Sequence, residues 1–257
     1  MPIVHVNADD YGLHRDIDGG ILDCVDAGRV TGVSVATNGA AIDWSGVRAL
    51  ARRVQVGVHV TLVGEPWLTR ALLFKSWSTL LPWLALPGRQ PLLEAEVHAQ
   101  VRAMVKAGVT PAHLDSHQHV HVMPRIWPVV ERVAREHGIG RIRIPATPDR
   151  RIAKRSLGGI GLQRLAQSRH SQDSLACIGI AHAGHNTATR LIQELIAADG
   201  VDVELVAHPG IHTAALQSHY ASWRFDWRTE QAALLSPEWG AACTRLGYDI
   251  AAPSLVD

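Results

Sequence analysis

Short runs of β-branched and other apolar residues alternate along the chain with longer segments whose apolar positions recur at a helical period. Such alternation is typical of βα units that build a largely parallel sheet. The pattern predicts strands at Ile3–Asn7, Val30–Thr37, Val54–Thr61, Ala112–Ser116, Arg141–Ile144, Leu175–Ile180 and Val201–Ala207. It predicts helices at Arg15–Ala27, Ile42–Arg53, Leu92–Ala107, Arg125–His137, Leu157–Ser168, Thr187–Ala198 and Thr229–Arg245. An α/β fold is therefore expected.

Strands and helices alternate one for one, which favours a barrel-like or doubly wound arrangement over two separate domains. The length of 257 residues suits one such domain, spanning residues 1–257. A long irregular stretch, Val63–Pro91, follows one of the predicted strands. We expect this insertion, residues 63–91, to be either a lid over a site or a small subdomain. A second irregular stretch runs from His208 to Arg228.

Charge and composition narrow the classes of function. Lysine and arginine number 25 and aspartate and glutamate 24, so the net charge is +1 and nothing global attracts nucleic acid. The 15 histidines outnumber the 8 Trp, 3 Tyr and 2 Phe taken together. Whether this excess reflects chemistry depends on where the histidines lie.

Cysteine usage and the N-terminus bear on the compartment. Cys24, Cys177 and Cys243 lie far apart without a CxxC pair, so they predict neither a disulfide framework nor a thiolate zinc site and suit a reducing environment. The N-terminus lacks the basic and apolar regions of an export signal. The most apolar stretch, Ala71–Leu86, is too interrupted by polar residues to cross a bilayer. A cytoplasmic location is expected.

Polar residues gather where the predicted strands end. In parallel α/β folds, ligands bind at the carboxyl ends of the strands, so these side chains are expected to meet on one rim. They are the pair Asp9-Asp10, then His59, the segment His113–His121, Arg143 and His208. Carboxylate, imidazole and guanidinium groups brought together from separate strands indicate a site for metal or acid–base chemistry.

The segment His113–His121 carries four imidazoles and one carboxylate at alternate positions. In an extended chain its ends would lie ~26 Å apart, too far for one ion to touch both. If the chain turns helical after Ser116, His117 and His121 fall one turn apart on a common face, which suits two metal ligands. His119 would then point elsewhere, so part of this segment must support the ligands or the fold.

One carboxylate and two imidazoles leave coordination positions open for water and substrate, which is typical of catalytic metal sites. We select three ligands from separate strand ends: Asp10, His59 and His117. His121 is the rival of His117, while His119 and Asp115 are further ligand candidates or supports of the ligands. A divalent ion in such a site would lower the pKa of a bound water and polarise a carbonyl group.

Three further residues complete the predicted catalytic set. Asp9, next to the ligand Asp10, is free to act as general base on the water. His208, held by the rigid Pro209-Gly210, is placed to protonate a leaving nitrogen. Arg143 is expected to orient Asp9 or neutralise it, because a guanidinium grips a carboxylate with two hydrogen bonds.

These motifs resemble those of the YdjC-like carbohydrate deacetylases, a family that includes chitooligosaccharide deacetylases and hopanoid-associated relatives. The matching pieces run in family order: Asn7-Ala8-Asp9-Asp10-Tyr11-Gly12, Thr37-Asn38-Gly39 with Ala41-Ile42-Asp43, Gly57–Leu62, the string HLDSHQHVH at His113–His121, Arg143-Ile144-Pro145 and His208-Pro209-Gly210. The string at His113–His121 is the most specific of them.

The resemblance implies a distorted, incomplete (β/α) barrel of the glycoside hydrolase and deacetylase type. It implies removal of acetyl groups from an N-acetylated carbohydrate, such as an N-acetylglucosamine-containing oligosaccharide or glycolipid. It carries metal binding onto His59 and His117, supports Asp10 as the third ligand and suggests magnesium. The donor set by itself also suits zinc, manganese or cobalt.

Contacts beyond the reacting centre are less well defined by the sequence. Trp67 in the insertion and Tyr11 beside the aspartate pair are the candidates for substrate binding. The tryptophans of the insertion either stack on sugar rings or fill a small core of their own. The basic residues between Arg141 and Arg169, with Ala71–Leu86 as an amphipathic partner, leave open a peripheral contact with an anionic membrane. Self-association into a homo-oligomer is also left open.

Two other classes of function remain as alternatives. A metal-dependent isomerase or phosphodiesterase on a similar barrel would more often show additional Glu and Lys ligands at the strand ends. A catalytically silent sugar-binding barrel would be expected to lack Asp9 or His208, and both are present.

Overall fold

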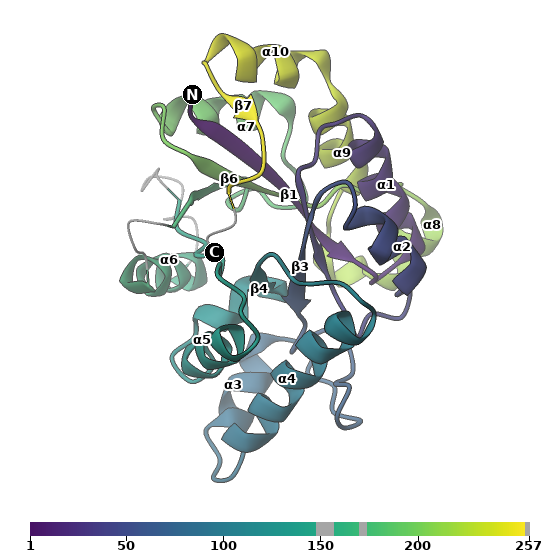
Figure 1. The fold of residues 1–257 in the computed structure, drawn as a ribbon, viewed down its shortest axis with the longest axis vertical. Helices are drawn as coiled ribbons and strands as arrows, with labels where there is room; N and C mark the ends of the chain where they lie inside the picture. The colour runs from purple at the N-terminus through teal and green to yellow at the C-terminus, as the bar shows by residue number, and fades with distance from the viewer. Residues whose placement is uncertain (148–156, 170–173, 255–257) are drawn as a thin grey trace.

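The strands of the sheet all run parallel and curl into part of a barrel, with helices on the outside (Figure 1). The computed structural model describes residues 1–147, 157–169 and 174–254. The strands are β1 (Ile3–Tyr11), β2 (Gly32–Val35), β3 (Gln55–Val60), β4 (Leu114–Ser116), β5 (Ala176–Ile178), β6 (Val203–Ala207) and β7 (Asp249–Ile250). Their order is β4-β3-β2-β1-β6-β5, with β7 paired to β1. This architecture confirms the expected α/β barrel-type fold.

The helices mostly follow the sequence prediction to within a few residues. They are α1 (Arg15–Asp26), α2 (Trp44–Leu50), α3 (Trp77–Leu84), α4 (Gln90–Lys106), α5 (Trp127–Glu136), α6 (Leu157–Arg169), α7 (Ala188–Ala197), α8 (Ala214–His219), α9 (Trp227–Leu235) and α10 (Pro237–Arg245), with 3-10 turns η1 (His117–Val122) and η3 (Ala221–Trp223). The prediction of one helix over Thr229–Arg245 was wrong. Ser236 is extended because it precedes Pro237, and it separates α9 from α10.

The predicted strand Arg141–Ile144 was also wrong. This segment forms a single parallel bridge to β4, and no ladder continues because the next residue, Pro145, has no N–H to donate. On its other side, the N–H of Cys177 in β5 donates to the carbonyl of Ala146 at 2.8 Å. The irregular segment 141–146 therefore lies between β4 and β5, and it carries Arg143 toward the interior of the barrel.

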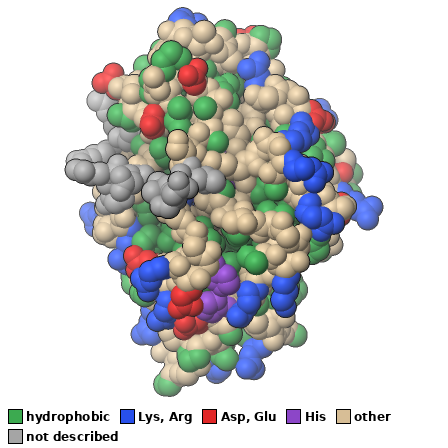
Figure 2. Space-filling view, viewed as in Figure 1, with side chains coloured by type: hydrophobic (Ala, Val, Ile, Leu, Met, Phe, Trp, Pro, Cys, Tyr) green, Lys and Arg blue, Asp and Glu red, His purple; other side chains and the backbone are tan. Residues whose placement is uncertain are grey.

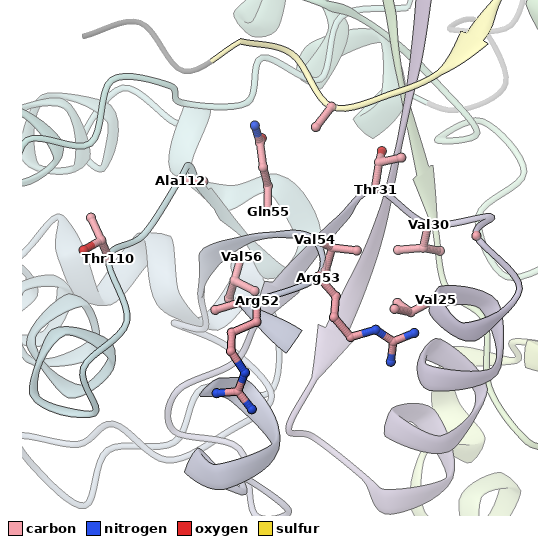
Figure 3. Close-up of a pocket in the computed structure, with 13 residues that line it drawn as sticks. Val25, Val30, Thr31, Arg52, Arg53, Val54, Gln55, Val56, Thr110 and Ala112 are labelled. Carbon is pink, nitrogen blue, oxygen red and sulfur yellow. The ribbon is translucent and has the colours of Figure 1, made fainter. Parts of the chain in front are cut away.

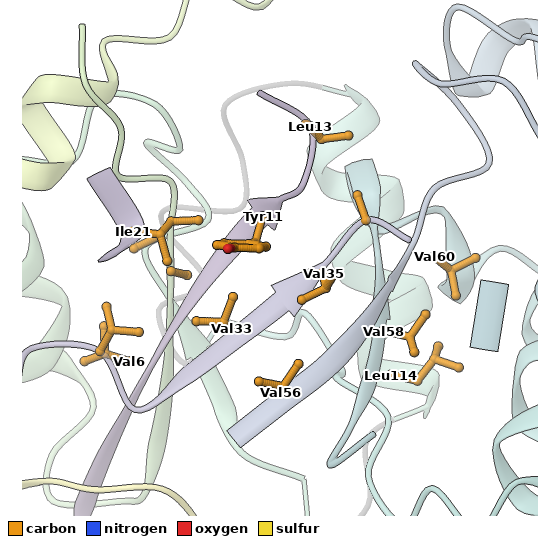
Figure 4. Close-up of a cluster of buried hydrophobic side chains, with 14 of the residues drawn as sticks. Val6, Tyr11, Leu13, Ile21, Val33, Val35, Val56, Val58, Val60 and Leu114 are labelled. Carbon is orange, nitrogen blue, oxygen red and sulfur yellow. The ribbon is translucent and has the colours of Figure 1, made fainter. Parts of the chain in front are cut away.

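The two faces of the strands bury different chemistry. The outer face packs on the helices through a hydrophobic cluster that includes Val6, Val33, Val35, Val56, Val58, Val60 and Leu114 (Figure 4). The inner side is polar and equally buried, with His5, Asn7, Asp9, Ser34, His59, His113, Asp115 and Glu204 on or next to the strands. A Cβ at Gly57 would lie 2.3 Å from the His113 ring, so glycine makes room for that imidazole. The polar residues of the strands thus fill the barrel interior.

The insertion 63–91 contains α3 and a small aromatic cluster. The Trp67 ring centroid lies 5.5 Å from that of Trp83 and 5.6 Å from that of Phe74. Trp67 is 3% exposed, and its indole N–H donates to the carbonyl of Leu62 at 3.1 Å. These tryptophans pack against one another and against the main hydrophobic core, whereas Trp77 at the start of α3 is exposed.

Candidate active site

A β-bulge brings both adjacent aspartates to the same region. The register between β1 and β2 shifts between Ala8 and Tyr11, and Asp10 adopts a left-handed φ of 75°. In a regular strand, neighbouring side chains point to opposite faces. Here Asp9 and Asp10 each approach the buried imidazole of His59 closely enough to share a metal-binding cluster with it.

Asp10, His59 and His117 form a buried cluster at the carboxyl ends of β1, β3 and β4. His59 Nε2 lies 3.1 Å from Asp10 Oδ1, and His117 Nδ1 lies 3.0 Å from the same oxygen. Asp10 Oδ2 and the Nε2 atoms of both imidazoles are buried and have no hydrogen-bond partner among the described residues. Unpartnered buried polar atoms of this kind suit a missing ligand, and the donor set suits a divalent ion. The structure thus brings together the three ligands selected from the sequence.

The imidazole of His59 is oriented from behind by Asp115. His59 Nδ1 lies 2.7 Å from Asp115 Oδ1, so Nδ1–H donates to that carboxylate and Nε2 faces Asp10. A metal-binding histidine commonly has such a carboxylate on its other nitrogen. Burial alone would lower the pKa of His59, but Asp115 and the two neighbouring aspartates outweigh it and raise the pKa to about 10. This surplus of negative charge favours a cation.

Arg143 grips Asp9 with both arms of its guanidinium. Its NH1 donates to Asp9 Oδ2 at 2.6 Å and its NH2 to Asp9 Oδ1 at 2.8 Å. The same guanidinium contacts Asp115 at 2.7 Å and Glu204 at 2.6 Å, and it is 1% exposed. Burial favours the neutral acid, but Arg143 outweighs this effect and holds the pKa of Asp9 below its usual range. Asp9 is therefore an oriented carboxylate that stays ionised.

A second group of potential ligands, Asp9, His59 and Asp115, overlaps the first. Arg143 already binds both carboxylates of this second group, so a cation is in place there. Arg141 pairs with Glu204 at 2.8 Å. The barrel interior thus holds two guanidinium groups and four buried carboxylates, those of Asp9, Asp10, Asp115 and Glu204. Without an ion, the protonated imidazoles of His59 and His208 balance the remaining negative charge. A divalent ion beside Asp10 would take the place of the His59 proton.

His121 differs from His117 in the partners of its ring nitrogens. His121 Nδ1 lies 2.7 Å from Ser116 Oγ, and its Nε2 lies 2.8 Å from the carbonyl of Arg143, so both nitrogens are occupied. The chain does turn after Ser116, in η1, but not as a regular helix that would align the two histidines. Gln118 and His119 are left-handed, with φ of 55° and 52°, and they separate the two rings.

The other imidazoles of this segment lie outside the cluster. His113 Nε2 contacts Ser34 Oγ at 2.9 Å in the barrel interior. His119 is partly exposed, with a buried Nδ1 that has no partner. Burial, together with the charge of Arg143, lowers the pKa of His119 well below its usual value. Among the described residues, neither takes part in a candidate metal cluster.

His208 follows β6 and lies against Glu230 of α9. The backbone N–H of His208 donates to Glu230 Oε2 at 2.6 Å, and His208 Nδ1 lies 3.5 Å from the same oxygen. Burial opposes a charge on this imidazole, but Glu230, Asp10 and Asp9 raise its pKa to about 9. His208 is therefore a cation at neutral pH. Sequence reasoning missed Glu230, which lies on a helix far along the chain.

The two predicted substrate contacts are not supported. Tyr11 is 3% exposed and lies in the hydrophobic cluster on the outer face, beside Ile21 and Val33 (Figure 4). Because Asp10 occupies a bulge, the next side chain turns away from the interior. Trp67 is enclosed by Phe74 and its face is not open to a sugar.

Aromatic residues from the second irregular stretch lie on the candidate site instead. The ring of Trp223 stacks on that of His117 with centroids 4.7 Å apart and an angle of 30° between the planes. The Phe225 ring lies edge-on to His208 at 5.2 Å. Their only sequence signal is the dense aromatic spacing between Tyr220 and Trp227.

Two cavities lie away from this site. One of about 620 Å³ lies at the amino ends of β2 and β3, where Thr31, Arg52 and Gln55 line it (Figure 3). Another of about 790 Å³ lies beside α1 and includes Asp18 and Asp43. Neither contains a member of the Asp10 cluster, and barrel folds carry their chemistry at the carboxyl ends of the strands.

The described basic residues between 141 and 169 do not all lie on the surface. Arg143 is internal, Arg141 is mostly buried, and Arg150, Arg151, Lys154 and Arg155 lie outside the described residues. Basic and acidic side chains are both scattered over the face shown in Figure 2. Within the described part of the chain, no helix is long and apolar enough to cross a membrane.

Comparison with known proteins agrees with these observations. The family model described as YdjC-like protein matches residues 3–245. A chitooligosaccharide deacetylase from Klebsiella pneumoniae (strain 342) is 34% identical over 215 residues, which cover 80% of this chain and 81% of the relative.

Two solved structures share the fold. A protein from Enterococcus faecalis V583, described as a cellobiose-phosphate cleavage protein, has a TM-score of 0.74 at 20% identity and covers 97% of both chains. A peptidoglycan N-acetylglucosamine deacetylase has a TM-score of 0.53 at 10% identity, covering 96% of this chain and 85% of the other. With the family match across most of its length, the chain belongs to the YdjC-like protein family.

Proposed function

We propose that this chain is a metal-dependent carbohydrate deacetylase that hydrolyses the N-acetyl group of an N-acetylglucosamine-containing oligosaccharide or glycolipid. The main support is the combination of an Asp-His-His cluster with an ionised carboxylate, Asp9, and a protonated imidazole, His208. The name of the Klebsiella relative supports the choice of reaction and substrate class.

Asp10, His59 and His117 would hold the ion. A divalent ion there supplies an acidic water and polarises the amide carbonyl. Magnesium follows from the family resemblance, while zinc, manganese and cobalt fit the same donors. Reconstitution of the metal-free protein with each ion in turn would identify the metal that supports activity.

Asp9 and His208 would divide the proton transfers between them. Asp9 accepts a proton from the attacking water, and Arg143 keeps that carboxylate ionised and pointed in one direction. A carboxylate with a depressed pKa is a weak base, so it acts only on a water that is itself acidic. His208 then donates its proton to the departing amine, which becomes a good leaving group only when protonated.

Acetate release from N-acetylglucosamine oligomers, measured with and without a chelator, tests the proposal. We expect acetate from the treated enzyme only after a divalent ion is restored. Release that is insensitive to prolonged chelation would contradict the metal dependence. Oligomer binding without acetate would favour the sugar-binding alternative.

A cytoplasmic location, a peripheral membrane contact and self-association remain predictions from the sequence. Flotation with acidic liposomes at low salt tests the membrane contact, which we would abandon if the protein stays unbound. Sedimentation of the purified chain tests the oligomeric state.

A further inference from the structure

The two proposed imidazole ligands are held in different ways. His59 has a carboxylate, Asp115, on the nitrogen that does not face Asp10. His117 contacts Asp10 through Nδ1, and among the described residues no hydrogen-bond partner meets its Nε2. Apart from Asp10, which is itself a proposed ligand, no described residue hydrogen-bonds the His117 ring to fix its orientation. A different contact must restrict this ring.

Trp223 provides that contact. Its indole stacks on the imidazole of His117 at 4.7 Å. Behind it, Tyr220 packs against the indole at 4.2 Å, and the Tyr220 hydroxyl donates to the Leu13 carbonyl and to Glu65 Oε1, each at 3.3 Å. These contacts tie η3 to the end of β1 and to the insertion. The indole is therefore supported from outside the segment that carries it.

We propose that Trp223 is a positioning residue that orients His117 for ion binding, a role that rests on the proposed function. Stacking restricts rotation of the imidazole about its Cβ–Cγ bond, which a hydrogen bond does for His59. An imidazole bound to a divalent ion also carries more positive charge, so the indole face attracts it more strongly. The stack thus favours the ion-bound form of the ring.

Cobalt binding to the intact chain tests this role without relying on turnover. Affinity is measured by competition with a chromophoric chelator, and the ligand geometry is followed by the visible absorption of bound Co²⁺. We expect Trp223→Leu to weaken binding by about tenfold or more, as loss of a group that orients a ligand does. Trp223→Phe keeps a flat ring and should recover most of the affinity and the wild-type spectrum.

Trp83→Leu is the matched control, because the ring contacts of Trp83 are with Trp67 and Phe74 in the insertion. It should leave cobalt affinity and spectrum unchanged, whereas equal weakening in Trp83→Leu would overturn the proposal. Wild-type binding by Trp223→Leu, with binding lost in His117→Ala, would also overturn it and leave the ligand set intact. Wild-type binding by His117→Ala would refute both the ligand set and the role of Trp223. If circular dichroism shows that Trp223→Leu does not fold, Trp223→Met takes its place, because methionine fills more of the volume without a flat ring. Weakened cobalt binding by Trp223→Met supports the role, and wild-type binding overturns it.

Discussion

Asp9 and Asp10 are neighbours of the same residue type, yet their surroundings give them different tasks. Arg143 and the side-chain amide of Asn7 donate hydrogen bonds to Asp9. Asp10 instead faces two imidazoles, and one of its oxygens has no partner among the described residues. The bulge at Asp10 makes this division possible, since it frees the two side chains from strict alternation.

Asp9→Asn separates the roles of base and ligand. The substitution removes the negative charge, so we expect turnover to fall by about 10²–10⁴-fold while ion affinity stays within about threefold of wild type. Stability should also fall, by about 3 kcal/mol, because a buried ion pair with Arg143 is broken. Acetate release, ion titration and thermal unfolding measure the three effects. Loss of ion binding in a folded variant would make Asp9 a ligand and refute its role as base.

His208 ties the rate to pH. His208 donates a proton only when it is charged, so kcat should fall as the pH rises through the pKa of His208, which is about 9 without an ion. A cation bound at Asp10 would repel the charge on His208 and lower this pKa. Glu230 helps to hold that pKa up, and Glu230→Gln should therefore move the alkaline limb to lower pH. A pH–rate profile of both proteins measures the shift. An unmoved limb in a folded variant would exclude His208 as the titrating acid.

Helix starts were predicted well where the sequence carries a capping residue, and turn geometry was not predicted where no such local signal exists. Helix α1 begins at Arg15 and α7 at Ala188 because His14 and Thr187 accept backbone N–H groups at their starts. A regular helical turn after β4 is interrupted at Gln118 and His119, two left-handed residues whose conformation no composition signal marks. Such strained conformations persist only where the surrounding structure holds them.

Helix α1 also carries a titratable group that affects stability. Asp18 accepts the N–H of Gly12 at 2.6 Å, and burial together with the charge of Asp43 raises its pKa to about 7. A raised carboxyl pKa means that the folded state holds the proton more tightly. The contribution of Asp18 to the free energy of unfolding is fully present below about pH 4 and is lost as the pH rises through its folded-state pKa of about 7.

Asp18→Asn keeps the acceptor oxygen and cannot ionise. Relative to wild type, we expect the variant to gain roughly 1–3 kcal/mol of stability between pH 5 and pH 8. Urea unfolding at the two pH values measures the difference. A constant difference between the two proteins would show that Asp18 does not titrate in this range.

The molecule as a whole contains two buried regions with opposite character. Helices and the outer strand face form the apolar core, while the barrel interior holds charged groups that are costly to bury unless they are balanced. Ion binding to the folded state should therefore stabilise the whole folded chain, and not only the residues around the site.

Thermal unfolding with and without a divalent ion tests this coupling. At an ion concentration of 100 Kd, the stabilisation of about 2.7 kcal/mol corresponds to a rise in Tm of roughly 5–10 °C for a chain of this size. His117→Gln should abolish the rise. His121→Gln should lower the Tm without ion but keep the rise, because both nitrogens of His121 serve the fold. The reverse result would make His121 the ligand.

The sequence by itself determined the parallel α/β architecture and the candidate residues Asp9, Asp10, His59, His117 and His208, because periodicity and polar strand ends are local features of the chain. Only the tertiary structure favours His117 over His121 as a ligand, since the partners of His121 are Ser116 and a carbonyl 22 residues away. It also buries Trp67 and stacks Trp223 on His117. Such contacts join segments far apart in the sequence, so no local pattern records them.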